Sequence, residues 1–286
     1  MNNYIEWFKK NKITEVECLI PDNSGIPRGK ILPTKKFLSS FESGGLRLPL
    51  HLFKLAVSRS VSYSIDDQLL NPTDGDFILK PDFNTLRVVP WYEEPTAQII
   101  CDAVDSKENE IEVYSRGILK RVISLFNNIG LEPIIAPEIE FYLVKKNNDP
   151  DYPLETPSGQ SGRIEKGNQS YGIDAINEFD HIFEDLYDYC EAQDLDVENI
   201  NHEDGPAQME INFKHGNPLD LADQVFLFKR TLRQTALKHN LYATFMAKPL
   251  EDSPGNSMHI HQSLLKKGKP DSTKSRKTEK RLLTII

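Results

Sequence analysis

The first hundred residues alternate between short apolar runs and clusters of turn-forming residues. The apolar runs occupy residues 16–20, 29–32, 77–79, 86–89 and 97–101. Pro, Asp and Gly separate them, as they separate the short strands of a small sheet. Residues 21–25 are the first of these breaks, so we expect a hairpin there with Asp22 exposed at its tip. The pattern predicts a small, strand-rich domain over residues 1–108.

Helical periodicity dominates further along the chain. Apolar residues recur at helical spacing over residues 115–129 and are followed by Gly130, a residue typical of helix ends. Residues 176–193 and 219–239 show the same periodicity, with strand-like segments between the helices. This order predicts an α+β fold, with a second domain over residues 109–286.

Three strand-like segments, residues 137–143, 208–213 and 257–263, alternate apolar with polar side chains. Because successive strand residues point to opposite faces, each segment has one polar face. These faces carry acids, imidazoles, hydroxyls and amides but no lysine: Glu138, Glu140, Tyr142, Gln208, Glu210, Asn212, Ser257, His259, His261 and Ser263. Alternation alone is common on antiparallel strands with a solvated face, so it is the composition of these faces that indicates a site.

Carboxylates that converge on neighbouring strands repel one another unless cations neutralise them. Glu203, just before the second segment, adds a further acid. Mg²⁺ or Mn²⁺ suits such an oxygen-rich set, and one histidine is compatible with either ion. A zinc site on His259 and His261 fits less well, because four or more acids would be surplus. The pattern therefore predicts a magnesium or manganese site.

Composition and charge narrow the functional classes. The 286 residues are 38% hydrophobic and 27% charged, as in globular proteins, with a net charge of −9. That acidity argues against a general binder of nucleic acid or anionic membranes, although residues 266–286 hold eight basic and two acidic residues. The sequence has no bilayer-length apolar run, no signal-peptide pattern and no cysteine framework, so we expect a cytoplasmic protein.

Five motifs occur in one order and with spacings that together are highly specific. They are Asp22-x-x-Gly25-x-x-Arg28-Gly29-Lys30, Glu138-x-Glu140-Phe141, His202-Glu203-x-Gly205-Pro206-x-Gln208-x-Glu210, Phe245-Met246-x-Lys248-Pro249 and His259-x-His261-x-Ser263-Leu264. In these motifs the chain resembles the glutamine synthetase superfamily, over about residues 12–265. Residues 169–174, 177–180, 202–208 and 258–263 are most similar to its gamma-glutamylputrescine synthetase branch.

The resemblance implies a fold and a reaction. The fold would be a small β-grasp N-terminal domain followed by a catalytic domain built on a curved antiparallel sheet with flanking helices. The reaction would be ATP-dependent: glutamate becomes γ-glutamyl phosphate, and an amine acceptor, either ammonia or putrescine, attacks it to form an amide. Two or more Mg²⁺ or Mn²⁺ ions would take part. The subunits would form homo-oligomeric rings with active sites between neighbours.

The resemblance also assigns roles to individual residues. Glu140, Glu203 and Glu210 would hold one metal ion, and Glu138 and His259 would hold a second. His261, Ser263 and Glu198 would lie near ATP, and Gly255 would border the glutamate pocket. Asp22 would reach in from the neighbouring subunit and take a proton from the amine.

The chain departs from the family pattern in two places. Residues 253–257 contain Pro254 where the family has an Asn-Gly-Ser-Gly-like run. Beyond Lys269 the sequence no longer resembles the family's continuation, with its further metal-binding glutamate and arginines. We therefore expect a truncated catalytic domain with an atypical basic tail at residues 266–286. The alternatives are a truncated, non-catalytic member of the family, such as a remnant or ring subunit, and, more distantly, a carboxylate-metal hydrolase.

Overall fold

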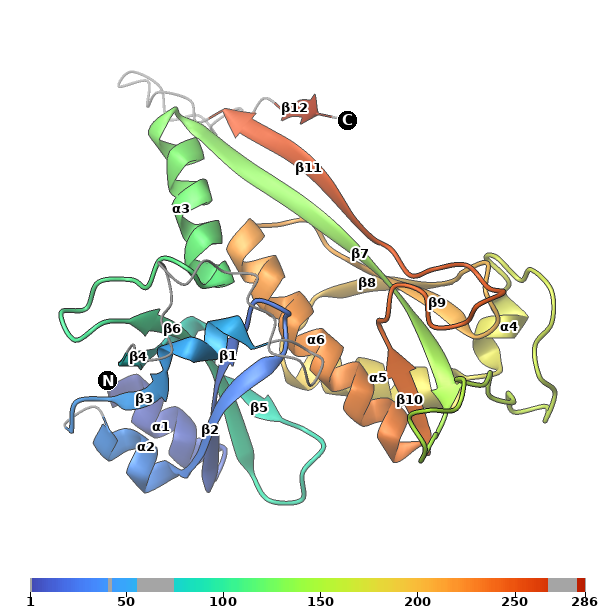
Figure 1. Ribbon diagram of the computed structural model, residues 1–286, viewed down its shortest axis with the longest axis horizontal. Coiled ribbons are helices and arrows are strands. Elements are labelled where there is room, and N and C mark those ends of the chain that lie inside the picture. Colours follow the sequence, from blue (N-terminus) through green and yellow to red (C-terminus); the bar gives the residue numbers. More distant parts are fainter. Residues whose placement is uncertain (1, 41–42, 56–74, 267–281, 286) are drawn as a thin grey trace. The chain divides into compact units, whose positions relative to one another are not determined.

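The computed structural model describes residues 2–40, 43–55, 75–266 and 282–285 (Figure 1). The chain forms two compact units, Met1–Asn128 and Ile129–Ile286. This division falls later than the domain boundary expected after residue 108, which stays a prediction. Most of the expected basic tail, residues 267–281 and 286, lies outside the described residues.

The first unit contains a six-stranded sheet of order β2-β1-β6-β4-β3, in which β5 also pairs with β6. Its strands are β1 (Glu15–Pro21), β2 (Pro27–Pro33), β3 (Leu46–Pro49), β4 (Asp76–Pro81), β5 (Arg87–Val89) and β6 (Thr96–Val104). All five predicted strands are confirmed, and β3 is an addition. The pair β1 and β6 is parallel, while the other pairs are antiparallel. The β-grasp arrangement stays a prediction.

The predicted hairpin between β1 and β2 is confirmed, but the expected exposure of Asp22 at its tip is wrong. The Asp22 side chain is fully buried. Its Oδ1 accepts hydrogen bonds of 2.9 Å from the backbone amides of Ser24 and Ile26, and its Oδ2 accepts one from Arg28 Nε at 2.9 Å. The carboxylate turns inward because the turn itself supplies these donors.

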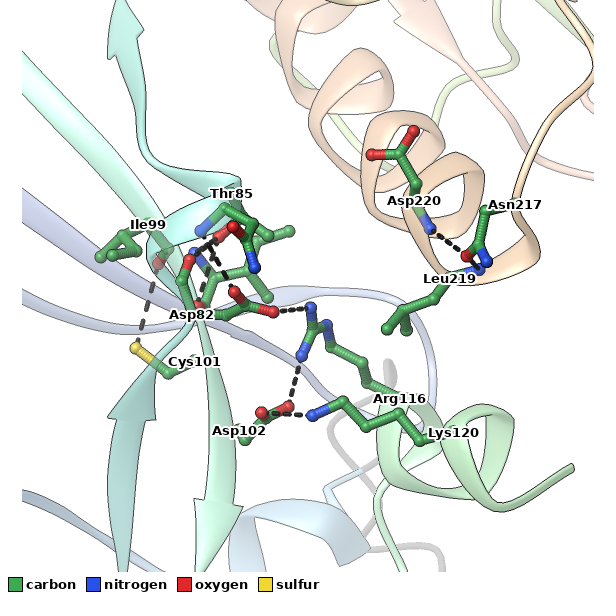
Figure 2. Close-up of polar contacts among 12 residues, drawn as sticks. Asp82, Thr85, Ile99, Cys101, Asp102, Arg116, Lys120, Asn217, Leu219 and Asp220 are labelled. Carbon is green, nitrogen blue, oxygen red and sulfur yellow. Dashed lines mark hydrogen bonds and ion pairs between the residues drawn. The ribbon is translucent and has the colours of Figure 1, made fainter. Parts of the chain in front are cut away.

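The helices of the first unit are α1 (Asn2–Lys10), α2 (Thr34–Ser40) and α3 (Ser115–Asn128), with 3-10 turns at Leu50–Lys54 and Phe83–Thr85. Ion pairs join the start of α3 to the sheet. The Arg116 guanidinium donates to Asp102 at 2.5 Å and to Asp82 at 2.6 Å, and Lys120 also pairs with Asp102 (Figure 2). The Arg116 side chain is only 3% exposed, so this contact is part of the unit's interior.

The second unit is built on an antiparallel sheet of order β12-β11-β7-β9-β8, in which β10 also pairs with β7 (Figure 1). Its strands are β7 (Leu131–Lys145), β8 (Val197–His202), β9 (Gln208–Phe213), β10 (Leu241–Thr244), β11 (Met258–Lys266) and β12 (Leu282–Ile285). The predicted α+β class and the antiparallel character of this sheet are confirmed.

The helices of the second unit are α4 (Ile173–Asn177), α5 (Asp180–Ala192) and α6 (Pro218–Lys238). The helix expected over residues 176–193 is confirmed over Asp180–Ala192, but it is not continuous, because Phe179 leaves the helical conformation between α4 and α5, with φ of −122°. Its side chain is 2% exposed, and the break lets it enter the core. Asn217 caps α6 by accepting hydrogen bonds from the amides of Leu219 and Asp220 (Figure 2), and Pro218 follows at the first helical position.

One face of β9 packs on α6. Met209, Ile211 and Phe213 are buried, and the Phe213 ring meets Phe228 of α6 edge to face at 5.2 Å. The polar side chains of β9 therefore point away from α6, which leaves that side of the sheet to the candidate site. None of the described helices is long and apolar enough to cross a membrane.

Candidate functional site

The strand register places the predicted acidic and imidazole side chains next to one another. Glu140 on β7 lies opposite Glu210 on β9, and Glu138 on β7 lies opposite His259 on β11. Directly opposed residues of neighbouring strands share one face of a sheet. Glu203 occupies the turn that connects β8 to β9. Five residues predicted as metal ligands thus come from three adjacent strands and one turn.

Three of these residues form a group of metal-binding size. Glu138, Glu210 and His259 each offer one ligand atom, and these atoms lie within 4.8 Å of one another. His259 Nδ1 is 3.7 Å from Glu138 Oε2 and 4.0 Å from Glu140 Oε1. The structure therefore brings His259 close to the carboxylates of both Glu138 and Glu140.

The electrostatics of the group favour a cation. Burial and the charge of Glu138 raise the pKa of Glu210 above its ordinary value, although Asn201 opposes the change through a hydrogen bond. Burial and the charges of Glu140 and Glu210 likewise raise the pKa of Glu203. Converging negative charges of this kind cost free energy that a divalent cation would remove. Carboxylate oxygens with one imidazole and no thiol fit Mg²⁺ or Mn²⁺.

Gln208 holds Glu140 in place, a role that the sequence pattern did not reveal. Its Nε2 donates to Glu140 Oε2 at 3.1 Å and to the carbonyl of Gly255 at 3.0 Å. Its Oε1 accepts from the amide of Gly205 at 2.9 Å. The backbone amide of Ser257 also donates to Glu140 Oε2, at 2.9 Å. These bonds engage one oxygen of Glu140, while the other faces His259. The sequence indicated only that Gln208 lies on a polar strand face and belongs to the motif over residues 202–210.

Tyr142 connects β7 to the loop before β11. Its hydroxyl donates to the carbonyl of Pro254 at 2.8 Å, and its side chain is fully buried. Burial, with the charges of Glu140 and Glu203, raises the pKa of Tyr142 to about 12, so the hydroxyl keeps its proton near neutral pH. Pro254, which departs from the family pattern, thus contributes its backbone carbonyl to this contact.

The three residues expected near ATP lie in surroundings that differ from one another. His261, expected near ATP, pairs with Glu138 at 2.9 Å and so borders the acidic group. Glu198 is exposed on β8, where the pairing with β9 is irregular. It does not belong to the group of Glu138, Glu210 and His259. Ser263 lies on β11 opposite Ile134.

Gly255 and Asp22 complete the predicted set. A Cβ at Gly255 would lie 2.6 Å from the carbonyl oxygen of Ala247, so this position in the loop has no room for a larger residue. Asp22 belongs to the first unit, where its carboxylate organises the turn after β1.

Comparison with known proteins reveals relatives over most of the chain. Residues 112–284 match the glutamine synthetase catalytic domain. The chain is 33% identical to the glutamine synthetase of Methanocaldococcus jannaschii over 269 residues, which cover 93% of this chain and 56% of that protein. It is 30% identical over 269 residues to gamma-glutamylputrescine synthetase PuuA of Escherichia coli, covering 92% of this chain and 55% of that protein.

A solved structure, that of apo GmaS without ligand, shares the fold. Its TM-score is 0.75 at 22% identity, over 92% of this chain and 57% of that one. The chain spans about half the length of the curated relatives it matches. The resemblance predicted from the five motifs is confirmed: this chain belongs to the glutamine synthetase family.

Proposed function

We propose that the chain is a ligase polypeptide that joins an amine to the γ-carboxylate of glutamate at the expense of ATP, through γ-glutamyl phosphate. The main observation behind the proposal is that ligand atoms of Glu138, Glu210 and His259 lie within 4.8 Å of one another. The domain that holds them belongs to a family of glutamate-amine ligases. A buried and a half-buried acid beside an imidazole suit a reaction in which phosphate oxygens must be held and their charge neutralised.

Two divalent ions, Mg²⁺ or Mn²⁺, are part of the proposal. Glu140, Glu203 and Glu210 would hold one ion, and Glu138 and His259 would hold the other. Bound ions of this type neutralise phosphate oxygens and orient the phosphoryl group during transfer. The hydrogen bonds from Gln208 and from the Ser257 amide to Glu140 support this assignment, because they fix the carboxylate in advance.

The substrate side of the proposal involves four further positions. His261, Ser263 and Glu198 would lie near ATP, and Gly255 would border the glutamate. The amine must lose a proton before it attacks the γ-glutamyl phosphate, and Asp22 from a neighbouring subunit would accept it. We propose putrescine or another polyamine as the acceptor, with ammonia as the alternative. Relatives of both kinds support testing both acceptors: the gamma-glutamylputrescine synthetase of Escherichia coli at 30% identity and the glutamine synthetase of Methanocaldococcus jannaschii at 33%.

The setting that we propose is a homo-oligomeric ring in the cytoplasm. The buried and unpaired cysteines Cys18, Cys101 and Cys190 support a reducing compartment. In such a ring, an active site shared between neighbouring subunits would allow Asp22 of one subunit to act at the second sheet of the next.

Phosphate release tests the proposed activity. With glutamate, MgATP and putrescine, the protein should release phosphate in an amine-dependent way, and ammonia in place of putrescine identifies the acceptor. Glu210→Gln should lower the rate by at least about 100-fold, because several kcal/mol of charge stabilisation depend on the metal ligands. Glu155→Gln, which alters the exposed pair with Lys145, is the matched control. No amine-dependent release at high protein concentration would contradict catalysis.

A second candidate is a chain that binds metal but does not catalyse the reaction. The buried carboxylate of Asp22 favours it, because both of its oxygens already accept hydrogen bonds within their own hairpin. Binding of Mn²⁺ without any phosphate release would favour this candidate. Tight binding of an ATP analogue together with amine-dependent turnover would count against it.

A further inference from the structure

His202 ends β8 directly before Glu203, and its imidazole is fully buried. Nδ1 lies 2.7 Å from the backbone carbonyl oxygen of Glu203, and Nε2 lies 3.1 Å from Glu165 Oε2. Both partners are hydrogen-bond acceptors, so the ring donates from both nitrogens when both bonds are formed. The imidazole thus connects the backbone of Glu203 to the carboxylate of Glu165.

The same carboxylate reaches the other side of the turn. Glu165 Oε2 also accepts a hydrogen bond of 2.8 Å from the backbone amide of Ala207. Ala207 has φ of +55°, a left-handed conformation that non-glycine residues seldom adopt. One oxygen of Glu165 therefore contacts both His202, which precedes the turn over residues 203–206, and Ala207, which follows it.

Residues 168–171 add further bonds to this turn. The amide of Tyr171 donates to the carbonyl of His202 at 3.0 Å. Asn168 Nδ2 donates to Asp204 Oδ1 at 2.9 Å, and the Ser170 hydroxyl bonds to the same oxygen. The segment from Glu165 to Tyr171 thus supports the turn at three places, none of which uses the carboxylate of Glu203.

We propose that Glu165 and His202 are positioning residues, which hold Glu203 in the place where it binds a divalent cation. The inference rests on the proposed function and extends it to two residues that are not themselves proposed metal ligands. Glu203 faces the like charges of Glu140 and Glu210, and this repulsion works to displace the turn when no cation is bound. The bonds from Glu165 oppose this displacement, so the carboxylate stays in position for the ion. Outer-shell partners of metal ligands act in this way.

Mn²⁺ affinity tests the inference without relying on turnover. Calorimetric titration of the full chain should show binding 10–100-fold weaker in Glu165→Ala than in the wild type, the usual effect of losing an outer-shell partner. Glu165→Gln should stay within a factor of about three of the wild-type affinity. With its oxygen in the place of Oε2, the glutamine can still accept hydrogen bonds from the Ala207 amide and from His202 Nε2.

Glu178→Ala is the matched control, because Glu178 accepts from the backbone amide of Ser161 at 2.8 Å and has no bond to the turn. It should bind Mn²⁺ like the wild type. Hydrogen exchange of residues 203–207 should be faster in Glu165→Ala and unchanged in Glu178→Ala. Should Glu165→Ala fail to fold, His202→Asn gives the same comparison, because it keeps a donor toward Glu203 but loses the contact with Glu165.

The outcomes separate the inference from the proposed function. Equal Mn²⁺ affinity of the wild type and Glu165→Ala, or equal weakening by Glu178→Ala, would overturn the positioning role alone. Weakening by Glu165→Gln as large as that by Glu165→Ala would also overturn it, because the hydrogen bonds would then be irrelevant. Absence of Mn²⁺ binding by the wild type would contradict the proposed function and the inference together.

Discussion

Glu140 illustrates how single residues acquire their surroundings in this chain. Alternation along the strand predicted that Glu140 lies on the same face as Glu138, and the structure confirms that both lie near His259. Its hydrogen bonds from Gln208 and Ser257, however, join positions 68 and 117 residues apart. Local pattern contains no information on partners at such separations, so these contacts could not be predicted.

Gly205 allows a close approach that the same neighbourhood depends on. A Cβ at this position would lie 1.9 Å from the Tyr142 hydroxyl and 2.7 Å from Gln208 Oε1. Because both side chains are buried, neither can move freely, and we expect Gly205→Ala to lower the free energy of unfolding by roughly 1–3 kcal/mol. Urea unfolding measures the change.

Gly216→Ala is the control for this prediction. A Cβ at Gly216 would meet its nearest neighbour, Leu221, at 3.6 Å, an ordinary contact. The free energy of unfolding should change by less than about 0.5 kcal/mol. If both substitutions changed the free energy of unfolding equally, steric contact with Tyr142 and Gln208 would not explain the effect at Gly205.

Among the elements, β7 has the longest run of pairings in its sheet. It pairs with β9, β10 and β11, whereas the sequence indicated only residues 137–143 of its fifteen-residue length. Alternation on β11 was also predicted, yet its apolar residues Met258 and Ile260 are 48% and 46% exposed. Periodicity predicts which residues share a face, while burial depends on what packs against that face.

The attachment of α3 to its sheet has a predictable pH dependence. Burial by itself would raise the pKa of Asp82, but the hydrogen bond and charge of Arg116 prevail and lower it below the ordinary 3.8. A carboxyl whose pKa is lower in the folded state than in the unfolded state stabilises the protein at pH values above its unfolded-state pKa. That contribution is lost as the pH falls below 3.8 and through the folded value.

Asp82→Asn tests this dependence. At pH 7 it should reduce the free energy of unfolding by about 1.5–3 kcal/mol, the usual range for a hydrogen bond to a charged group. The difference from the wild type, measured by urea unfolding, should shrink below the ordinary carboxyl pKa of 3.8. Glu108→Gln removes an exposed pair with Lys80 and should change little at either pH. A pH-independent effect of Asp82→Asn would contradict the charge-based explanation.

At the scale of the whole molecule, the proposed metal ligands all belong to one compact unit. Glu138, Glu140, Glu203, Glu210 and His259 lie within Ile129–Ile286. The net charge of −9 argued against a general binder of nucleic acid or anionic membranes, and part of that charge comes from the acids gathered on this sheet. A negatively charged protein can bind a polyphosphate when divalent cations neutralise its acidic site.

Hydrogen exchange with and without Mn²⁺ tests this division. A ligand that binds only the folded state stabilises the unit that holds it, so Mn²⁺ should slow exchange in β7, β9, β11 and residues 203–206. Exchange in β1, β2 and β6 of the first unit should stay the same. KCl at equal ionic strength is the control and should protect neither unit. Uniform protection, or none, would contradict the assignment of the ligands to the second unit.

By itself the sequence determined the α+β class, most strands, the polar strand faces and, through five motifs, the family. These features depend on local periodicity and on the residue types that the chemistry needs. Only the tertiary structure decided that Asp22 is buried, that His261 pairs with Glu138, and that Glu165 supports the turn of Glu203. Such contacts depend on strand register and on loops without periodicity, where the partners are far apart along the chain and close only after folding.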